Sequence, residues 1–264
     1  MSDDIVLTLS TNFVRTLAEE GMRVFVPNQA HTIGEKIGLS RKKVNALLLR
    51  LKHQEWILPI KRGLYHLNPV FLSGFPIHEF EIALHLVRFG YISHLSAFHY
   101  HNLTDQIPRD IYISVPSNTY FPRSSGKSCF EFEGVSYHFV QMKKSHIFGH
   151  KSIWMGDVKI QLADLERTLL DGIMRPDLCG GFREVLNAFH LNQDRIDMNQ
   201  IISYTLKTEA STSKRLGWIL ESLKVDNNKM EFLETLPFKG WIRLDNSSPK
   251  KGNYNKRWQI QENL

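Results

Sequence analysis

The sequence predicts an α+β protein, with an N-terminal winged helix-turn-helix and a larger, mixed α/β domain behind it. Two helix patterns and a hairpin pattern follow one another between residues 31 and 68, and a basic charge excess is confined to the same stretch. Strand and helix patterns mix along the rest of the chain, beyond turn residues at 68–76. We therefore predict domains at residues 1–75 and 76–264, and 264 residues with 42% hydrophobic content can supply two cores.

The chain is expected to open with a helix over residues 8–20, because Phe13 and Leu17 lie four apart and turn to one side. Gly21 ends this helix. Residues 22–27 then predict a short strand that joins the hairpin sheet as its third member.

The helix-turn-helix prediction rests on spacing and turn residues in the next stretch. A short helix carries Ile33 and Ile37 on one face, and Gly38 follows where a left-handed conformation stops a helix. Ser40 is a good N-cap for the second helix. The apolar residues of that helix recur at i, i+3, i+4 and i+7 and form one buried stripe: Val44, Leu47, Leu48 and Leu51.

A hairpin is expected next, since apolar residues 56–60 and 64–67 flank the turn Lys61, Arg62, Gly63. Between residues 28 and 68 there are eight Lys or Arg and two Glu, and this excess of six equals the formal net charge of the whole chain, +6. A basic excess on one helix face and a hairpin tip is the pattern expected for contact with a phosphate backbone.

The residues predicted to contact DNA lie on that helix face and hairpin: Ser40, Arg41, Lys42, Lys43, Asn45, Arg50, Lys61 and Arg62. Solvated Lys and Arg faces are common on helices, and helix-turn-helix shapes also serve as protein-binding modules. The placement of the charge favours DNA over these alternatives.

The second domain is predicted from apolar spacing and from alternating, β-branched runs. Helices are expected over residues 78–89, 93–103, 162–174, 182–190, 198–206 and 213–223, and strands over 110–115, 129–132, 135–142 and 158–160. Ser93 is the expected N-cap of the second of these helices. The helix at 162–174 has the clearest inward stripe, formed by Leu162, Leu165, Leu169 and Ile173.

The tail, residues 236–264, combines Lys and Arg with Trp241 and Trp258. Such a combination can bind nucleic acid by stacking. An extended strand that covers the second domain, with both tryptophans as anchors, is the interpretation we favour.

Other constellations are weak signals of chemistry. The chain has a group of histidines without an i, i+4 ligand pair: His78, His85, His94, His99 and His101. Polar surface or partner contacts are therefore favoured over a metal site. Asp164, Glu166 and Asp171 suggest a nuclease-like acid cluster, but Arg167 between them favours a salt-bridge and capping network. No glycine motif for phosphates occurs, and no cofactor is expected.

The cellular compartment is predicted from cysteine usage and hydropathy. Cys129 and Cys179 are 50 apart without a CxxC pair and are expected to be reduced, buried thiols. No apolar run approaches the ~20 residues that cross a bilayer. The first ten residues begin acidic and do not resemble a secretory signal, so we expect a cytoplasmic protein without a membrane partner.

Several separate stretches resemble one protein family. They are KRGLYHL at 61–67, YISHLSAF at 91–98 with Leu103 and IYISVP at 111–116 after it, DLERTLLD at 164–171 with Arg175-Pro176, Gly180-Gly181 and Glu184 behind it, and the closing segment from Leu244-Asp245 through Gly252 to Arg257-Trp258. In this order they resemble the AbiEi antitoxins of type IV toxin–antitoxin systems, which are bacterial winged-helix regulators. Asn102 stands where the family pattern has Gly, so its local turn departs from the family.

The resemblance implies a non-catalytic protein with two tasks. Its N-terminal domain would repress its own operon at inverted-repeat operator DNA, and its C-terminal antitoxin domain would counteract a cognate AbiEii-type nucleotidyltransferase toxin without need of a stable complex. The antitoxin-domain motif maps onto Asp164, Glu166, Arg167, Thr168 and Asp171. These residues would either oppose a partner or order the domain as a buried ion-pair network. The alternative function is a winged-helix protein whose C-terminal domain is an enzyme that modifies nucleic acid.

Overall fold

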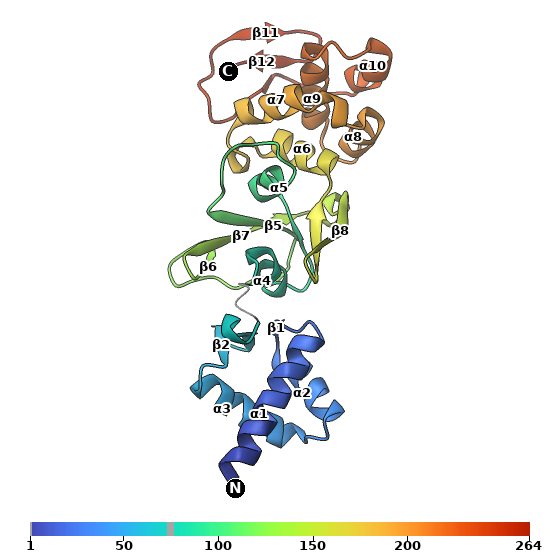
Figure 1. The fold of residues 1–264 in the computed structure, drawn as a ribbon. Helices are drawn as coiled ribbons and strands as arrows, with labels where there is room; N and C mark the ends of the chain where they lie inside the picture. The colour runs from blue at the N-terminus through green and yellow to red at the C-terminus, as the bar shows by residue number, and fades with distance from the viewer. Residues whose placement is uncertain (1, 73–76) are drawn as a thin grey trace. The chain divides into compact units, whose positions relative to one another are not determined.

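The computed structural model describes residues 2–72 and 77–264, which divide into two compact units (Figure 1). The first unit comprises residues up to Arg88 together with Trp154–Lys159, and the second comprises Phe89–Ile153 and Ile160–Leu264. The predicted boundary between residues 75 and 76 falls on 73–76, which lie outside the described residues.

The first unit contains the predicted helices, turn and hairpin. Its elements are α1 (Ser2–Glu19), β1 (Val24–Phe25), α2 (Pro27–Lys36), α3 (Arg41–His53), β2 (Ile57–Lys61), β3 (Leu64–Leu67) and α4 (Glu79–His85). The strands form one antiparallel sheet in the order β1-β3-β2, so β1 is the expected third member. Gly38 has a φ of +77°, and the Ser40 hydroxyl accepts the backbone N–H of Lys43 at 3.5 Å.

One hydrophobic core holds α1, α2, α3 and the three strands together. Phe13 and Leu17 of α1 are fully buried, as predicted, and the stripe of α3 formed by Val44, Leu47, Leu48 and Leu51 is buried as well. The helices α2 and α3 approach closely at Gly34, where a Cβ atom would lie 2.2 Å from the Val44 side chain. Only glycine fits there without a shift of the Val44 side chain.

Two predicted helices of the first unit have different limits. α1 begins at Ser2 and not at residue 8, and α4 ends at His85 instead of continuing to residue 89. α4 is capped by His78, whose Nδ1 accepts the backbone N–H of Phe80 at 3.0 Å.

The second unit is built around a mixed sheet. Its strands are β4 (Tyr91–Ile92), β5 (Asp110–Pro116), β6 (Phe130–Phe132), β7 (Val135–Met142), β8 (His150–Met155) and β9 (Val158–Ala163), although the last two residues of β8 and the first two of β9 are grouped with the first unit. They form the order β6-β7-β5-β4-β9-β8, with parallel pairing of β5 to β7 and of β4 to β9. The predicted strand at 110–115 and the hairpin at 129–142 are thereby confirmed, whereas β4 and β8 were missed.

Helices cover this sheet in layers. They are α5 (His94–Tyr100), α6 (Leu165–Met174), α7 (Phe182–Leu191), α8 (Met198–Thr205), α9 (Ala210–Ser222) and α10 (Asn227–Thr235). α6 packs against α5, α7, α8 and α9, and Figure 1 shows it between the sheet and the outer helices. The tail adds a small sheet, β10 (Ile242–Arg243), β11 (Asn253–Asn255) and β12 (Ile260–Glu262), in the order β10-β12-β11.

The tail covers the second unit, but only one of its tryptophans is an anchor. Trp258 is fully buried in the helical core, whereas Trp241 is 50% exposed. The prediction that both anchor the tail is therefore wrong for Trp241, which makes an edge contact with Tyr254 instead.

Three local predictions need correction. The helix at 162–174 begins at Leu165, because Leu162 belongs to β9 and pairs with Ile92. Ser93 lies at the N-cap position of α5, as predicted, but its hydroxyl makes no capping hydrogen bond and instead contacts the His94 ring and the Ser114 hydroxyl. Asn102 has a φ of +56°, a left-handed conformation that Asn tolerates better than most residues, so it takes the glycine's place in the turn after α5.

Candidate functional site

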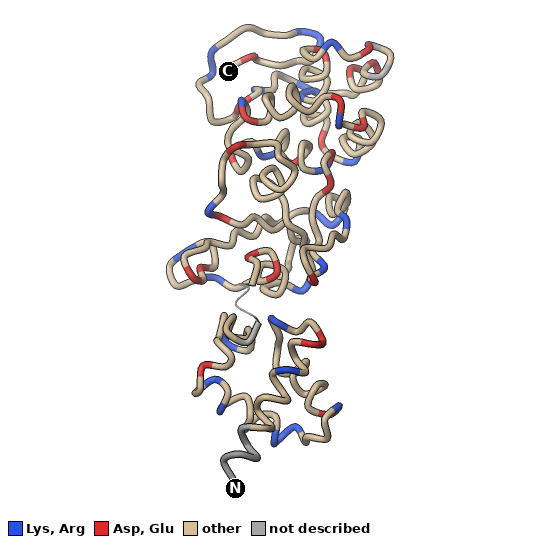
Figure 2. Tube along the Cα trace, viewed as in Figure 1, with Lys and Arg blue, Asp and Glu red and all other residues tan. Residues whose placement is uncertain are grey.

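The eight predicted DNA-contacting residues all belong to α3, its N-cap or the β2–β3 hairpin. The first turn of α3 carries Arg41, Lys42 and Lys43, all exposed, and contains no acidic residue. Figure 2 shows that the charged positions of this unit are mostly Lys and Arg. The N-terminus of a helix has a partial positive charge. An acidic side chain there stabilises the helix by about 0.3–1 kcal/mol, whereas a cation destabilises it. This placement opposes helix stability and suits an anionic partner.

Within the described residues, Lys42 and Lys43 have no carboxylate partner. Arg41 lies 3.5 Å from Glu35, and this pair is well exposed and therefore weak. Lys36 of α2 pairs with Glu20 at 2.7 Å. The lysine pair is thus the least compensated positive charge at this end of α3.

The remaining predicted positions lie on the same helix or at the hairpin tip. Asn45 is exposed on α3, and Arg50 is half-buried further along it. Lys61 is half-exposed at the end of β2, and Arg62 is exposed in the turn, where Gly63 has a φ of +77°. These groups lie on α3 and at a hairpin tip, where their polar ends are accessible to an anionic partner.

The sequence pattern did not predict two further residues of this face, His31 and Leu49. His31 of α2 contacts Asn45 through its ring, and its Nε2 lies 2.7 Å from the Asn45 Oδ1. This contact fixes the orientation of the Asn45 amide. Leu49 is 72% exposed on α3. The exposure of Leu49 could have been predicted from the sequence, because this residue falls outside the i, i+3, i+4, i+7 stripe of its helix.

The antitoxin-domain motif lies on α6 and at its N-terminus, where each polar side chain has an internal partner. Asp164 caps α6, with Oδ1 accepting the Arg167 backbone N–H at 2.8 Å and Oδ2 accepting the Tyr204 hydroxyl at 2.8 Å. Thr168 donates to the Asp164 carbonyl at 2.7 Å. Glu166 accepts the backbone N–H of Asp197 at 2.9 Å and thereby ties α6 to the start of α8.

Arg167 and Asp171 form a fully buried ion pair. The Arg167 Nη2 lies 2.8 Å from the Asp171 Oδ1, and both side chains are 0% exposed. The guanidinium also stacks over Phe148 at 4.6 Å. Burial alone would lower the pKa of Arg167, but Asp171, with smaller contributions from Tyr91 and Asp164, outweighs it and raises the pKa above its ordinary value. The arrangement corresponds to the ion-pair network that orders the domain, one of the two interpretations of this motif.

His94 shares this buried region. It has a φ of +52° and contacts the Ser93 hydroxyl through Nδ1 at 2.8 Å, while Nε2 has no hydrogen-bond partner in the described chain. Burial lowers the pKa of His94, a shift that the Asp171 carboxylate opposes and Arg167 reinforces. Burial therefore favours the neutral imidazole in the folded protein.

Stability is expected to fall on acidification from about pH 7 to pH 5. Burial lowers the pKa of His94 in the folded chain, so the unfolded chain takes up this proton at a higher pH than the folded chain and protonation favours unfolding. Thermal melting at several pH values tests this. In His94→Asn, a residue that tolerates the positive φ, melting temperature should depend less on pH, and the exposed His190→Asn should match wild type. An equal dependence of melting temperature on pH in wild type and both variants would contradict the assignment of this effect to His94.

The clustered histidines do not converge on one point. His101 contacts the Ala163 carbonyl through Nε2 at 2.8 Å, and His85 contacts the Glu81 carbonyl through Nδ1 at 2.8 Å. Among the described residues, no three His, Cys, Asp or Glu side chains are grouped as metal ligands would be. Cys129 and Cys179 are both free and buried, as predicted. None of the helices in the described ranges is long and apolar enough to cross a membrane.

The geometry defines a mixed α/β protein of two units. A comparison with known protein families gives no match, and neither does one with well-characterised proteins. The structure is similar to the crystal structure of the RV2827C protein from Mycobacterium tuberculosis, with a TM-score of 0.61 and 12% sequence identity over 94% of this chain and 88% of that chain. At this identity, the similarity supports the fold alone.

Proposed function

We propose that the first unit is a winged helix-turn-helix that binds double-stranded operator DNA through α3 and the β2–β3 hairpin. The observation that carries this proposal is the first turn of α3, where Lys42 and Lys43 are exposed and uncompensated at the positive end of a helix. A phosphate backbone neutralises such charges and releases its own counterions on binding.

We further propose that the whole chain acts as a cytoplasmic, non-catalytic antitoxin and represses its own operon. The support is the AbiEi-like order of motifs along both units, with DLERTLLD on α6 and its cap. Because the motif side chains are bonded internally, α6 would contribute to antitoxicity by holding the second unit in shape. The cognate toxin would be a nucleotidyltransferase encoded beside it.

Changing Lys42 and Lys43 together to Ala is expected to weaken operator binding by at least about tenfold, because two cations that contact phosphates are lost. Folding should be unaffected, since both side chains are exposed. Gel-shift titration at moderate salt with DNA from upstream of the coding sequence measures the effect.

The matched control is Lys250→Ala with Lys251→Ala, an exposed pair in the tail that removes the same charge. It should leave the midpoint near wild type. If the tail variant weakened binding and the α3 variant did not, the tail would be the DNA site and the assignment of α3 would be wrong.

The antitoxin proposal is tested by growth. Co-expression of the chain with the neighbouring nucleotidyltransferase gene should restore growth that the toxin alone stops. A failure of rescue, with operator binding intact, would remove the antitoxin function and leave the DNA-binding proposal standing.

A further inference from the structure

Strand β7 has an uncovered edge. On one side β5 pairs with it from Ser136 to Met142, and on the other β6 pairs only with Val135–Tyr137. From His138 to Met142, that second side has no strand neighbour in the part of the chain that the structure describes. Alternate backbone N–H and C=O groups of a strand point to such a side, which is a template for a further strand.

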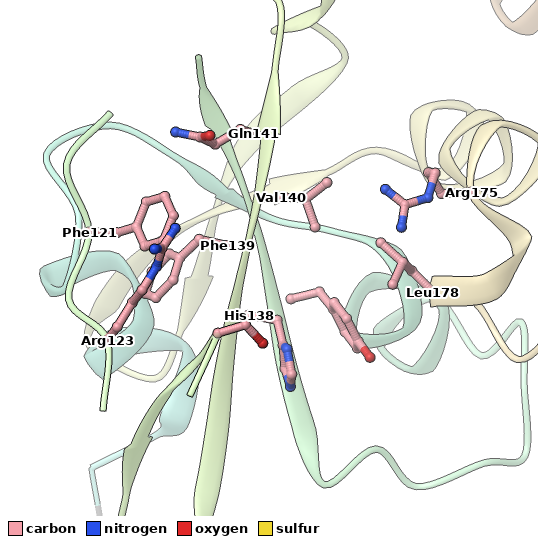
Figure 3. A pocket seen from close by; sticks show the side chains of 10 residues that line it. Phe121, Arg123, His138, Phe139, Val140, Gln141, Arg175 and Leu178 are labelled. Carbon is pink, nitrogen blue, oxygen red and sulfur yellow. The ribbon is translucent and has the colours of Figure 1, made fainter. Parts of the chain in front are cut away.

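A pocket of about 350 Å³ follows this edge and takes side chains from both faces of the sheet. Tyr112 and His138 stack on one face, with ring centroids 5.1 Å apart, and Phe121 and Phe139 stack on the other, 4.7 Å apart. Figure 3 shows Phe121, Phe139 and Arg123 on one side of the strand, and Val140, Arg175 and Leu178 on the other. The side chains of an added strand alternate between the two faces in the same way.

The charges at this edge are unequal. Arg175 is held by Asp177 through two hydrogen bonds of 2.9 and 2.7 Å, so its charge is compensated. Arg123 lies over the Phe121 ring at 5.0 Å and has no carboxylate partner among the described residues. It also lines a second pocket, of about 420 Å³, that shares Phe121 and Gln141 with the first. A partner at this edge therefore meets, on the Phe121 face, an arginine without a carboxylate partner in the described chain. On the other face it meets an apolar surface whose arginine, Arg175, is already paired with Asp177.

We propose that the uncovered edge of β7 binds an extended peptide segment of a protein partner by strand addition. Backbone hydrogen bonds to residues 138–142 would hold the peptide, with acidic side chains directed to Arg123 and apolar side chains to Tyr112 and Leu178. A nucleobase fits less well, because the aromatic rings are already stacked in pairs and the pocket extends around both faces of the strand. This binding is independent of the DNA-binding surface.

The probe is a fluorescein-labelled peptide of about seven alternating Leu and Glu residues, with a Leu and Lys version as its charge-reversed partner. Full-length protein should bind the acidic peptide in an anisotropy titration. Arg123→Glu should weaken that binding by about tenfold or more and improve binding of the basic peptide. The control Lys151→Glu makes the same charge change on β8, the opposite edge strand, and should leave both affinities unchanged.

Two N-methylated acidic peptides test the backbone geometry. Methyl groups on alternate residues remove one set of N–H donors or the other, so strand addition predicts that one version loses binding and the other retains it. Equal binding of both versions, equal effects of Arg123→Glu and Lys151→Glu, or no binding of the acidic peptide would each overturn the proposal. So would a dimer that Arg123→Glu converts to monomer, since the edge would then belong to a second copy.

Discussion

Arg167→Ala is expected to lower the free energy of unfolding of the second unit by about 3–5 kcal/mol. The substitution leaves the Asp171 carboxylate without its cation in a fully buried position between the sheet and the helical layer. It also removes the guanidinium that stacks over Phe148. Denaturant unfolding followed by circular dichroism measures the loss, and toxin rescue should be lost with it.

The matched control is Arg175→Ala, which breaks the arginine–aspartate pair with Asp177. Those side chains are 48% and 51% exposed, so the expected cost is about 1 kcal/mol or less. A double variant, Arg167→Met with Asp171→Leu, removes both buried charges and should recover most of the lost stability. If Arg167→Ala abolished rescue while unfolding and operator binding stayed at wild-type values, α6 would be a working surface and not a structural one.

Trp258→Ala is expected to cost about 3–5 kcal/mol of unfolding free energy. The indole fills the space over Gly217 so closely that a Cβ atom on that glycine would lie 2.1 Å from the ring. Its Nε1 also donates to Glu221 at 2.8 Å. The substitution opens a cavity between α9 and the small sheet of the tail, so the tail should detach before the rest of the unit unfolds.

Limited proteolysis reports that detachment, with Trp241→Ala as the control. Trp241 is half exposed, and its loss should cost about 1 kcal/mol or less and leave the cleavage pattern unchanged. Equal protection of all three proteins would show that Trp258 does not anchor the tail.

The fold was predictable where local chemistry determines it. Gly38, Ser40 and the stripe of α3 marked the turn and the buried face, because capping and periodicity act within a few residues. β4 has only two residues, and β8 is mostly exposed with no buried alternating face, so neither carries a strand pattern. The pairing of β4 depends on β5 and β9, which lie further along the chain, whereas β8 pairs with the next strand, β9.

The candidate site was predictable in part for the same reason. The cations of α3 are visible in the sequence because charge and helical phase place them on an open face. The burial of Arg167 is not visible, since α6 is surrounded by α5, α7, α8 and α9, and this packing buries polar as well as apolar positions. An amphipathic pattern implies that one side of the helix is exposed to solvent. In α6, however, all residues from Glu166 to Ile173 are buried. The contact of His31 with Asn45 depends likewise on how α2 crosses α3.

The salt dependence of operator binding tests the central proposal, that α3 meets the DNA backbone. Anisotropy titrations of wild type and of the Lys42→Ala, Lys43→Ala variant at several salt concentrations give the slope of log K against log salt. Loss of two phosphate contacts should reduce the magnitude of that slope by about 1.8, while the Lys250→Ala, Lys251→Ala control keeps the wild-type slope. Equal slopes for wild type and both variants, or a reduced slope in the tail variant alone, would contradict the proposal that α3 contacts the DNA backbone.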